Sequence, residues 1–493
     1  MRVATNQTLA RHSAAGCCAA WVAFAALFLT AAIAHAADAG RRPNVVLVMT
    51  DNHGAWTLGC YGNREIKTPN IDRLAAEGML FTRAYCTHSL CSPSRATFLT
   101  GLIPSQHGLH YTVTEASDAD PAGSDQSCAI REFETLPKSL ARAGYVCGLS
   151  GKWHLGGFTR PQEGFQYWFT MPGGHTMTYY GAQVFWQGKI QKEPGYLIDA
   201  MTDHAVDFIR QNRDKPFFLF LTYDAPYGVS SCFTRPHENR HTAYYADKPL
   251  TSFPREKVHP SQKYRLELIN NPVAIRGYAA AVSGVDDGVG TILKTLADLG
   301  IDKDTIVIFT ADQGFNGGHG GMWGLGEHTE PPNTREPVVR IPLIVRHPSR
   351  IAPHAVCDRM IASYDLLPTV LAYLGLSDRI PSKPSLPGRD FSPLLLGRAM
   401  AWDDVIFHEF DRTRMIRTPR WKLTRRYPHG PDELYDMQSD PEERRDLHAD
   451  AASAQTLRDL TARLEQFFDR YADPKYDRTR NGKSKFERDF NFR

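Results

Sequence analysis

Residues 44–50 read Asn-Val-Val-Leu-Val-Met-Thr and are followed by Asp51 and Asn52. Continuous rather than alternating hydrophobicity is typical of a strand covered on both faces, as in a parallel sheet. Three further runs have the same character, at residues 217–222, 305–310 and 342–345. We interpret all four runs as buried parallel strands.

Helical patterns lie between and after these runs. Residues 68–78 combine a threonine cap, a first-turn proline and a terminal glycine, and residues 273–299 carry a long apolar periodicity. Strands alternating with helices predict an α/β fold with a large, mostly parallel or mixed central sheet flanked by helices. Short strand-like runs after Gly388, followed by an amphipathic helix at 457–468, predict a smaller C-terminal α+β domain on a short antiparallel sheet.

The N-terminus has the pattern of a secretory signal peptide, which we assign to residues 1–36. Arg2 and Arg11 precede an apolar run at 19–33, and the small-residue cleavage pattern Ala-His-Ala ends at Ala36. The run is shorter than the ~20 residues that a membrane span needs. We therefore expect cleavage before Ala37, a secreted or periplasmic protein and no stable membrane span. A large domain at 41–387 and the smaller domain at 388–493 would follow.

The net charge and the cysteine content restrict the functions that the chain can have. A formal net charge of +3 over 493 residues gives no support for nucleic-acid binding, so an anionic ligand must be recognised by local basic residues. Two of the nine cysteines, Cys17 and Cys18, lie in the predicted signal peptide. The other seven cysteines are odd in number, so at least one thiol is unpaired or chemically converted.

Two pairs of polar residues follow separate predicted strands, Asp51 with Asn52 and Asp312 with Gln313. Ligands of open α/β sheets lie beyond the carboxyl ends of the strands, so the two pairs are expected to converge. Their oxygen donors suit a hard cation such as calcium better than zinc. Any one of these residues alone would more simply be a helix cap or a turn.

The segment Cys91-Ser92-Pro93-Ser94-Arg95 predicts a helix start, with the proline in the first turn. Cys91 would then lie at the positive end of the helix dipole, and Arg95 on the same face would pair with an oxyanion at position 91. The spacing alone equally fits a buried thiol near an unrelated arginine.

Lys152 and His154 lie between Gly151 and Gly156. They are expected to point at one anionic group, with the lysine supplying charge and the histidine a proton. A solvated loop is the alternative interpretation.

The segment from Pro43 to His110 resembles the sulfatase family of the alkaline-phosphatase-like superfamily. The resemblance rests on Asp51-Asn52, on the cysteine–arginine segment and on residues 59–63, 68–75 and 99–101. It extends to residues 151–154, 310–314, 433–436 and 440–443, and so over nearly the whole chain after the signal peptide.

The resemblance implies a reaction. In the family, the cysteine at the position of Cys91 is oxidised to Cα-formylglycine by a formylglycine-generating enzyme, and the aldehyde hydrates to a diol. One diol oxygen attacks the sulfur of a sulfate ester in line, the bond from sulfur to the ester oxygen breaks, and the alcohol departs. The other hydroxyl then loses its proton, sulfate is eliminated and the aldehyde returns. The expected substrate is a sulfated small molecule or glycan, most simply a sulfated carbohydrate.

The resemblance also implies roles for individual residues. Arg95 would stabilise the diol, while Lys152 and His154 would bind the diol or the sulfate. Calcium would be held by Asp51, Asn52, Asp312, Gln313 and the converted Cys91.

The sequence departs from the family where substrate sulfate is expected to bind. Tyr227 occupies the place of a common histidine, and Leu325 follows Trp-Gly where many relatives have lysine. We hypothesise that a nearby basic residue substitutes, the candidates being His319, His328 and Arg335; hydrogen bonding within a loop is the alternative. Tyr227 itself is a candidate substrate-binding residue. His175, which lies in an aromatic and polar stretch, is a candidate for lining a sugar subsite; a packed loop is the alternative.

Two other functions remain open. A phosphodiesterase or phosphonate monoester hydrolase on the same scaffold would share the metal edge, although the missing basic groups disfavour a phosphoryl dianion. A non-catalytic glycan-binding relative would explain those losses but would not require Cys91, Pro93 and Arg95.

Overall fold

The computed structural model describes Met1 and residues 42–113, 128–174, 176, 178–229, 231–234 and 238–486. The predicted signal peptide, apart from Met1, and His175 lie outside these residues. The chain forms two units, Met1–Pro43 and Asn44–Arg493, and the second carries every element discussed below. Across the described residues, no helix combines the length and hydrophobicity needed to cross a membrane.

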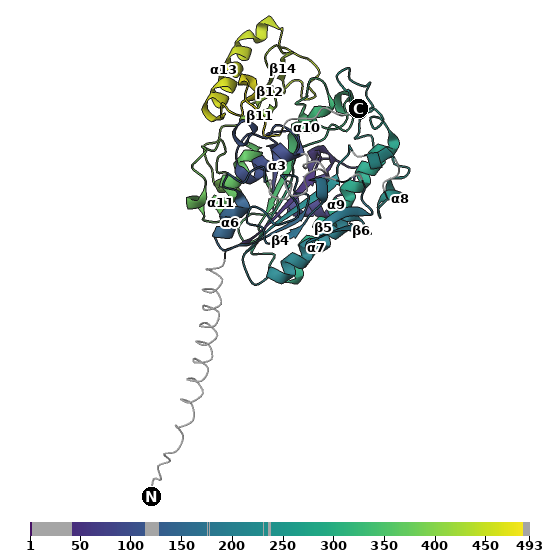
Figure 1. Ribbon diagram of the computed structural model, residues 1–493, viewed down its shortest axis with the longest axis vertical. Helices are drawn as coiled ribbons and strands as arrows, with labels where there is room; N and C mark the ends of the chain where they lie inside the picture. The colour runs from purple at the N-terminus through teal and green to yellow at the C-terminus, as the bar shows by residue number, and fades with distance from the viewer. Residues whose placement is uncertain are drawn as a thin grey trace. The chain divides into compact units, whose positions relative to one another are not determined.

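An eight-stranded sheet forms the centre of the second unit (Figure 1). Its strands, in spatial order, are β10 (Ala355–Ala362), β2 (Met79–Tyr85), β9 (Arg340–Arg346), β8 (Thr305–Ala311), β1 (Asn44–Asp51), β7 (Phe217–Pro226), β3 (Val146–Gly151) and β4 (Tyr167–Phe169). The predicted α/β class and mixed central sheet are confirmed.

The direction predicted for residues 342–345 is wrong. They form part of β9, which runs antiparallel to both of its neighbours, β8 and β2, whereas all other neighbouring strands of this sheet are parallel. The strand is buried along nearly its whole length. Its continuous hydrophobicity therefore reports coverage on both faces and carries no information about direction.

Helices cover both faces of the sheet. Val45, Leu47 and Met49 of β1 pack on one face with α3 (Cys91–Thr100), α6 (Leu136–Arg142) and α11 (Leu366–Tyr373). Val46 and Val48 pack on the other with α2 (Pro69–Ala76), α7 (Leu197–Asn212) and α9 (Pro272–Asp298). Burying each such aliphatic side chain contributes about 1.5–3 kcal/mol, which fixes the alternation of β1 between the two layers.

The remaining regular elements are short. A hairpin of β5 (Ala182–Trp186) and β6 (Lys189–Glu193) lies outside the central sheet. Single turns of helix occur at α4 (Pro104–His107), α8 (Thr242–Tyr245), α10 (Glu336–Val339) and α12 (Ser392–Leu395).

A four-stranded antiparallel sheet confirms the predicted C-terminal α+β architecture. It comprises β11 (Ile406–Phe410), β12 (Thr413–Arg417), β13 (Trp421–Arg426) and β14 (Glu433–Asp436). Helix α13 (Ala454–Tyr471) lies against β12 and β13 (Figure 1). The domain boundary at residue 388 stays a prediction.

Glu336, at the start of α10, joins the two sheets. Its carboxylate accepts hydrogen bonds from Tyr85 of β2 at 3.2 Å and from Arg417 of β12 at 3.0 Å, and it lies 3.5 Å from the Lys422 ammonium of β13. Burial alone would raise the pKa of Glu336, but Lys422 and Arg417 outweigh burial and lower it to about 2.

We predict that Glu336→Gln lowers the free energy of unfolding by about 3 kcal/mol at pH 7, because the buried Arg417 guanidinium loses its carboxylate partner and the Lys422 ammonium keeps only Glu443. The native pKa is depressed, so this contribution is complete above the unfolded value of 4.5 and is lost as pH falls toward 2. Urea denaturation at pH 7 and pH 3 should therefore give a smaller difference between wild type and variant at pH 3. The exposed Glu442→Gln is the control, expected within about 0.5 kcal/mol. Equal effects of the two substitutions would contradict the assignment.

Candidate active site

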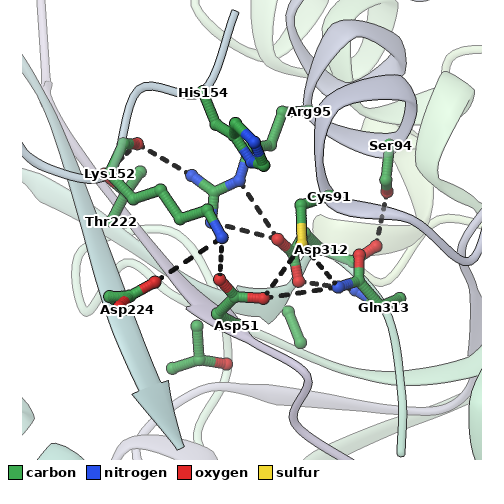
Figure 2. A network of polar contacts seen from close by, with 12 residues as sticks. Asp51, Cys91, Ser94, Arg95, Lys152, His154, Thr222, Asp224, Asp312 and Gln313 are labelled. Carbon is green, nitrogen blue, oxygen red and sulfur yellow. Dashed lines mark hydrogen bonds and ion pairs between the residues drawn. The ribbon is translucent and has the colours of Figure 1, made fainter. Parts of the chain in front are cut away.

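Four adjacent strands bring distant residues to one edge of the central sheet. Because β8, β1, β7 and β3 are parallel neighbours, their carboxyl ends lie together. Asp51 ends β1, Asp224 lies near the end of β7, and Asp312 and Lys152 directly follow β8 and β3. Figure 2 shows these four side chains facing one another.

The backbone turns sharply as the chain leaves these strands. Asn52, His154 and Tyr227 have φ angles of 56°, 58° and 28°, which are unusual for residues other than glycine. In addition, the register of β1 and β7 shifts, so that Met49 pairs with Thr222 but Asp51 with Pro226. Such strained turns and bulges occur preferentially at functional sites, where they aim side chains.

Lys152 lies between two carboxylates. Its ammonium forms an ion pair with Asp51 and lies 3.5 Å from Asp224, and all three side chains are completely buried. The backbone N–H of Thr176 donates to the other oxygen of Asp224 at 3.1 Å. Asp224 was not among the predicted site residues; the available signal was a carboxylate two residues after the apolar run at 217–222.

Arg95 connects α3 to the strand ends by an ion pair and a hydrogen bond. Its Nε and Nη2 atoms lie 3.1 and 3.0 Å from one carboxylate oxygen of Asp312, and its Nη1 donates to the Lys152 carbonyl at 2.8 Å. The Ser94 hydroxyl donates to the Asp312 carbonyl. These contacts fix the position at which the helix begins.

Cys91 is the first residue of α3, and its side chain is only 4% exposed. Its Sγ lies 3.3 Å from Oδ1 of Asp51 and 3.1 Å from Nε2 of Gln313 (Figure 2). Burial and the Asp51 charge raise the pKa of the Cys91 thiol well above its ordinary value. An unmodified cysteine here is therefore a neutral thiol and a poor nucleophile.

The pKa values of the three carboxyl groups of the site are shifted in different directions. Burial would raise the pKa of Asp51, but Lys152 and Arg95 outweigh burial and lower it. Burial and the nearby Asp51 charge raise the pKa of Asp312 to about 7. Burial, with a further contribution from Asp51, raises the pKa of Asp224 to about 8 despite Lys152. The site thus concentrates more carboxylate than its own cations neutralise.

The donor atoms fit a hard cation. Ligand atoms of Asp51, Cys91 and Asp312 all lie within 4.8 Å of one another. The Gln313 amide nitrogen faces Oδ1 of Asp51 at 3.3 Å and the Asn52 amide oxygen, while its own Oε1 is buried without a hydrogen-bond partner among the described residues. Exchanging the two amide atoms would turn that unused oxygen toward the same centre. Carboxylate and amide oxygens are typical calcium ligands.

The other predicted site residues have varied surroundings. Tyr227 donates its backbone N–H to the Asp51 carbonyl at 3.1 Å, and its ring lies 5.0 Å from the Lys152 ammonium. The His154 carbonyl accepts from Ser92 at 2.8 Å, and its ring packs closely against Gly174. Both residues therefore border the Cys91 site.

The three candidate basic residues make local contacts. His319 hydrogen bonds to the Asn316 carbonyl at 2.8 Å and packs on Trp56, and His328 accepts from the Leu325 N–H at 2.9 Å. Arg335 donates to the Glu443 carbonyl and lies over the Tyr435 ring. Their part in substrate binding stays a prediction, as does that of His175.

Comparison with known proteins identifies the family. The sequence model of the sulfatase family matches residues 43–376, and that of the C-terminal region of N-sulphoglucosamine sulphohydrolase matches residues 333–470. The chain belongs to the sulfatase family. This sulfatase is thus a sulfuric ester hydrolase with an alkaline-phosphatase-like fold, as the resemblance implied.

Similar proteins cover most of this sulfatase. N-acetylglucosamine-6-O-sulfatase of Bacteroides thetaiotaomicron is 30% identical over 88% of this chain and 87% of that enzyme. Human N-acetylgalactosamine-6-sulfatase is 33% identical over 78% of this chain and 71% of its own. A solved structure in complex with its substrate D-glucosamine-2-N,6-O-disulfate has a TM-score of 0.69 and 26% identity, covering 89% of this chain and 99% of that one.

We predict that Lys152→Met destabilises the metal-free protein by about 3–5 kcal/mol, because it leaves two buried carboxylates without their cation. The pKa values of these carboxyls would then lie above their unfolded values, so their cost grows as pH rises. Chemical denaturation should show a larger loss at pH 8 than at pH 6. Lys294→Met, on the exposed face of α9, is the control and should cost under about 0.5 kcal/mol at either pH. A loss independent of pH would contradict this account of the charge network.

Proposed function

We propose that this sulfatase hydrolyses sulfate esters of carbohydrates with a formylglycine hydrate at position 91 and a bound calcium ion. The observation that carries the proposal is the position of Cys91 at the start of α3, with its Sγ 3.3 Å from an oxygen of Asp51. Conversion of this buried, neutral thiol to an aldehyde supplies the nucleophile that the cysteine itself cannot.

The residues around position 91 have complementary tasks. Arg95 and Lys152 carry positive charge toward any oxyanion formed there. His154, which follows Lys152 by two residues, is proposed to donate a proton or bind sulfate. Asp51, Asn52, Asp312 and Gln313 would hold calcium, which would polarise sulfate oxygens and lower the pKa of the attacking hydroxyl.

The proposed substrate class rests on the relatives. The two similar enzymes are named for sulfated amino sugars, and a similar structure contains a disulfated glucosamine. We propose a sulfated carbohydrate for this chain as well. Tyr227 is then proposed to border the substrate. One of the three basic residues His319, His328 and Arg335 is proposed to supply the positive charge that Tyr227 and Leu325 lack.

The remaining alternatives are less well supported. The three buried carboxylates against two buried cations disfavour a phosphomonoester dianion. Phosphodiesters and phosphonate monoesters carry one negative charge, as a sulfate ester does, so the family match and not the charge of the site favours sulfate over them. A purely glycan-binding role leaves the buried Cys91 and Arg95 network without a purpose. Parallel assays on an aryl sulfate and an aryl phosphodiester distinguish these possibilities.

We predict that protein co-produced with a formylglycine-generating enzyme carries an aldehyde at position 91, detected by mass spectrometry of the peptide containing that residue. Cys91→Ala should reduce kcat on a 6-O-sulfated amino sugar at least about 10³-fold, because the nucleophile is removed. Cys86→Ala, a buried thiol five residues earlier, is the matched control and should keep both modification and activity. Full activity of an unmodified protein would refute the proposal.

We predict that calcium raises the melting temperature, with a stabilisation of about 2.7 kcal/mol at a concentration one hundred times its Kd. Asp312→Asn should reduce the effect because it removes a negative charge from the proposed ligand set, and Gln313→Ala because it removes a proposed oxygen ligand. Asp298→Asn, on the surface of α9, should leave it unchanged. The calcium ligands would be wrongly assigned if differential scanning calorimetry gave the same shift in all four proteins.

We propose that the protein is exported and cleaved after Ala36, on the strength of the charged start, short apolar run and Ala-His-Ala pattern. N-terminal sequencing of protein from the periplasm or medium of its producing cell should then begin at Ala37. Recovery of intact chain in the cytoplasm alone would contradict export.

A further inference from the structure

A second cavity lies apart from the Cys91 site. It has a volume of about 290 Å³ and is lined by residues of α13, of the strand-to-helix turn at Tyr364 and of the segment from 387 to 407. None of its lining residues belongs to the active site described above. Its volume is at the lower end of the range for small-molecule sites, about 300–1,000 Å³.

The cavity has an aromatic wall centred on Phe467. The Phe467 ring stacks on Phe407 with centroids 3.8 Å apart, and the rings of Tyr471 and Tyr364 lie 5.1 and 6.2 Å away. All four aromatic residues line the cavity. Tyr364 and Phe407 are buried, so Phe467 and Tyr471, both half-buried, present a rigid apolar surface to the cavity.

Positive charge surrounds the aromatic wall. Arg389, Arg463 and Arg470 line the cavity together with a single acid, Asp403, so the lining has an excess of two positive charges. Arg463 forms an ion pair with Asp403, and Arg389 donates to the Asp403 carbonyl at 2.8 Å. Arg470 is exposed and forms no ion pair within the part of the chain that the structure describes. An arginine next to an aromatic wall is therefore available to a ligand.

The sequence of α13 accounts for this arrangement. Arg463, Phe467 and Arg470 are spaced by four and three residues, which places them on one face of the helix. A second part of the lining is held by other contacts, since the Arg389 guanidinium lies 3.9 Å above the Trp402 ring. The two parts of the lining thus present guanidinium groups to the same space from separate chain segments.

We propose that this cavity binds a sulfated sugar residue, as a second saccharide site separate from the site of hydrolysis. A guanidinium fork matches two oxygens of a sulfate group and is weakly hydrated, which favours binding of a sulfate monoanion. The aromatic wall packs against the less polar face of a sugar ring. A bare inorganic anion would contact only the guanidinium groups, and a neutral sugar would contact only the aromatic wall. Binding here does not depend on the proposed reaction at residue 91, because no group of that site takes part.

Hydrogen–deuterium exchange tests the proposal on the full chain, with the Cys91→Ala variant preventing turnover. A 6-O-sulfated chondroitin tetrasaccharide should slow exchange in peptides covering residues 463–471, and its chemically desulfated counterpart should not. Arg470→Gln should raise the Kd measured from this protection about fivefold, and the double substitution Arg463→Gln/Arg470→Gln should abolish it. Arg458→Gln, an exposed arginine of α13 outside the cavity, is the control and should leave protection unchanged.

The proposal would be overturned by no protection of α13 with the sulfated probe, by equal protection with the desulfated one, or by an unchanged Kd in Arg470→Gln. Protection confined to peptides around residues 91 and 152 would place the saccharide only at the active site and would also overturn it. If these variants bind as predicted while protein with an aldehyde at position 91 hydrolyses no sulfate ester, the proposed reaction fails and the cavity assignment stands.

Discussion

The structure depends on the ion network buried at the edge of the central sheet. Three carboxylates and two cations lie there without solvent, and charges so deeply buried are tolerated only when they are paired. Lys152 joins β3 to β1 and β7, while Arg95 joins α3 to β8. The groups proposed to perform chemistry are therefore the same groups that hold the strand ends and the helix together. One consequence is that the Arg95–Asp312 ion pair holds the helix that begins at residue 91 against the strand ends.

Two further residues lie around the Lys152 ammonium. Asp224 lies 3.5 Å from it on the side of β7, and burial raises the pKa of this carboxyl to about 8 despite the lysine. The Tyr227 ring lies 5.0 Å from the same nitrogen. Near neutral pH, the charge of Lys152 is therefore balanced chiefly by Asp51.

The sequence predicted those features that depend on local pattern. The buried run at 44–50, the helix starts near residues 69 and 272, and the placement of Asp51 and Asp312 at strand ends all follow from periodicity and capping. It did not predict the direction of β9, because burial on both faces leaves the same hydrophobic run whichever way a strand points. Asp224 was missed for a related reason: its nearness to Lys152 depends on the pairing of β7 with β3, which no local pattern encodes. The C-terminal cavity likewise arises from segments more than seventy residues apart in sequence, Arg389 and Arg463 among them.

The central claim is that oxygens from two distant chain segments hold a divalent cation against residue 91. A crystal structure of the aldehyde-bearing protein grown with calcium tests this most directly. The account predicts one ion with oxygen ligands from Asp51, Asn52, Asp312 and Gln313 at about 2.3–2.6 Å, and a diol oxygen of residue 91 beside it. A structure in which Gln313 keeps its amide nitrogen toward Asp51 and no ion separates Asp51 from residue 91 would contradict it.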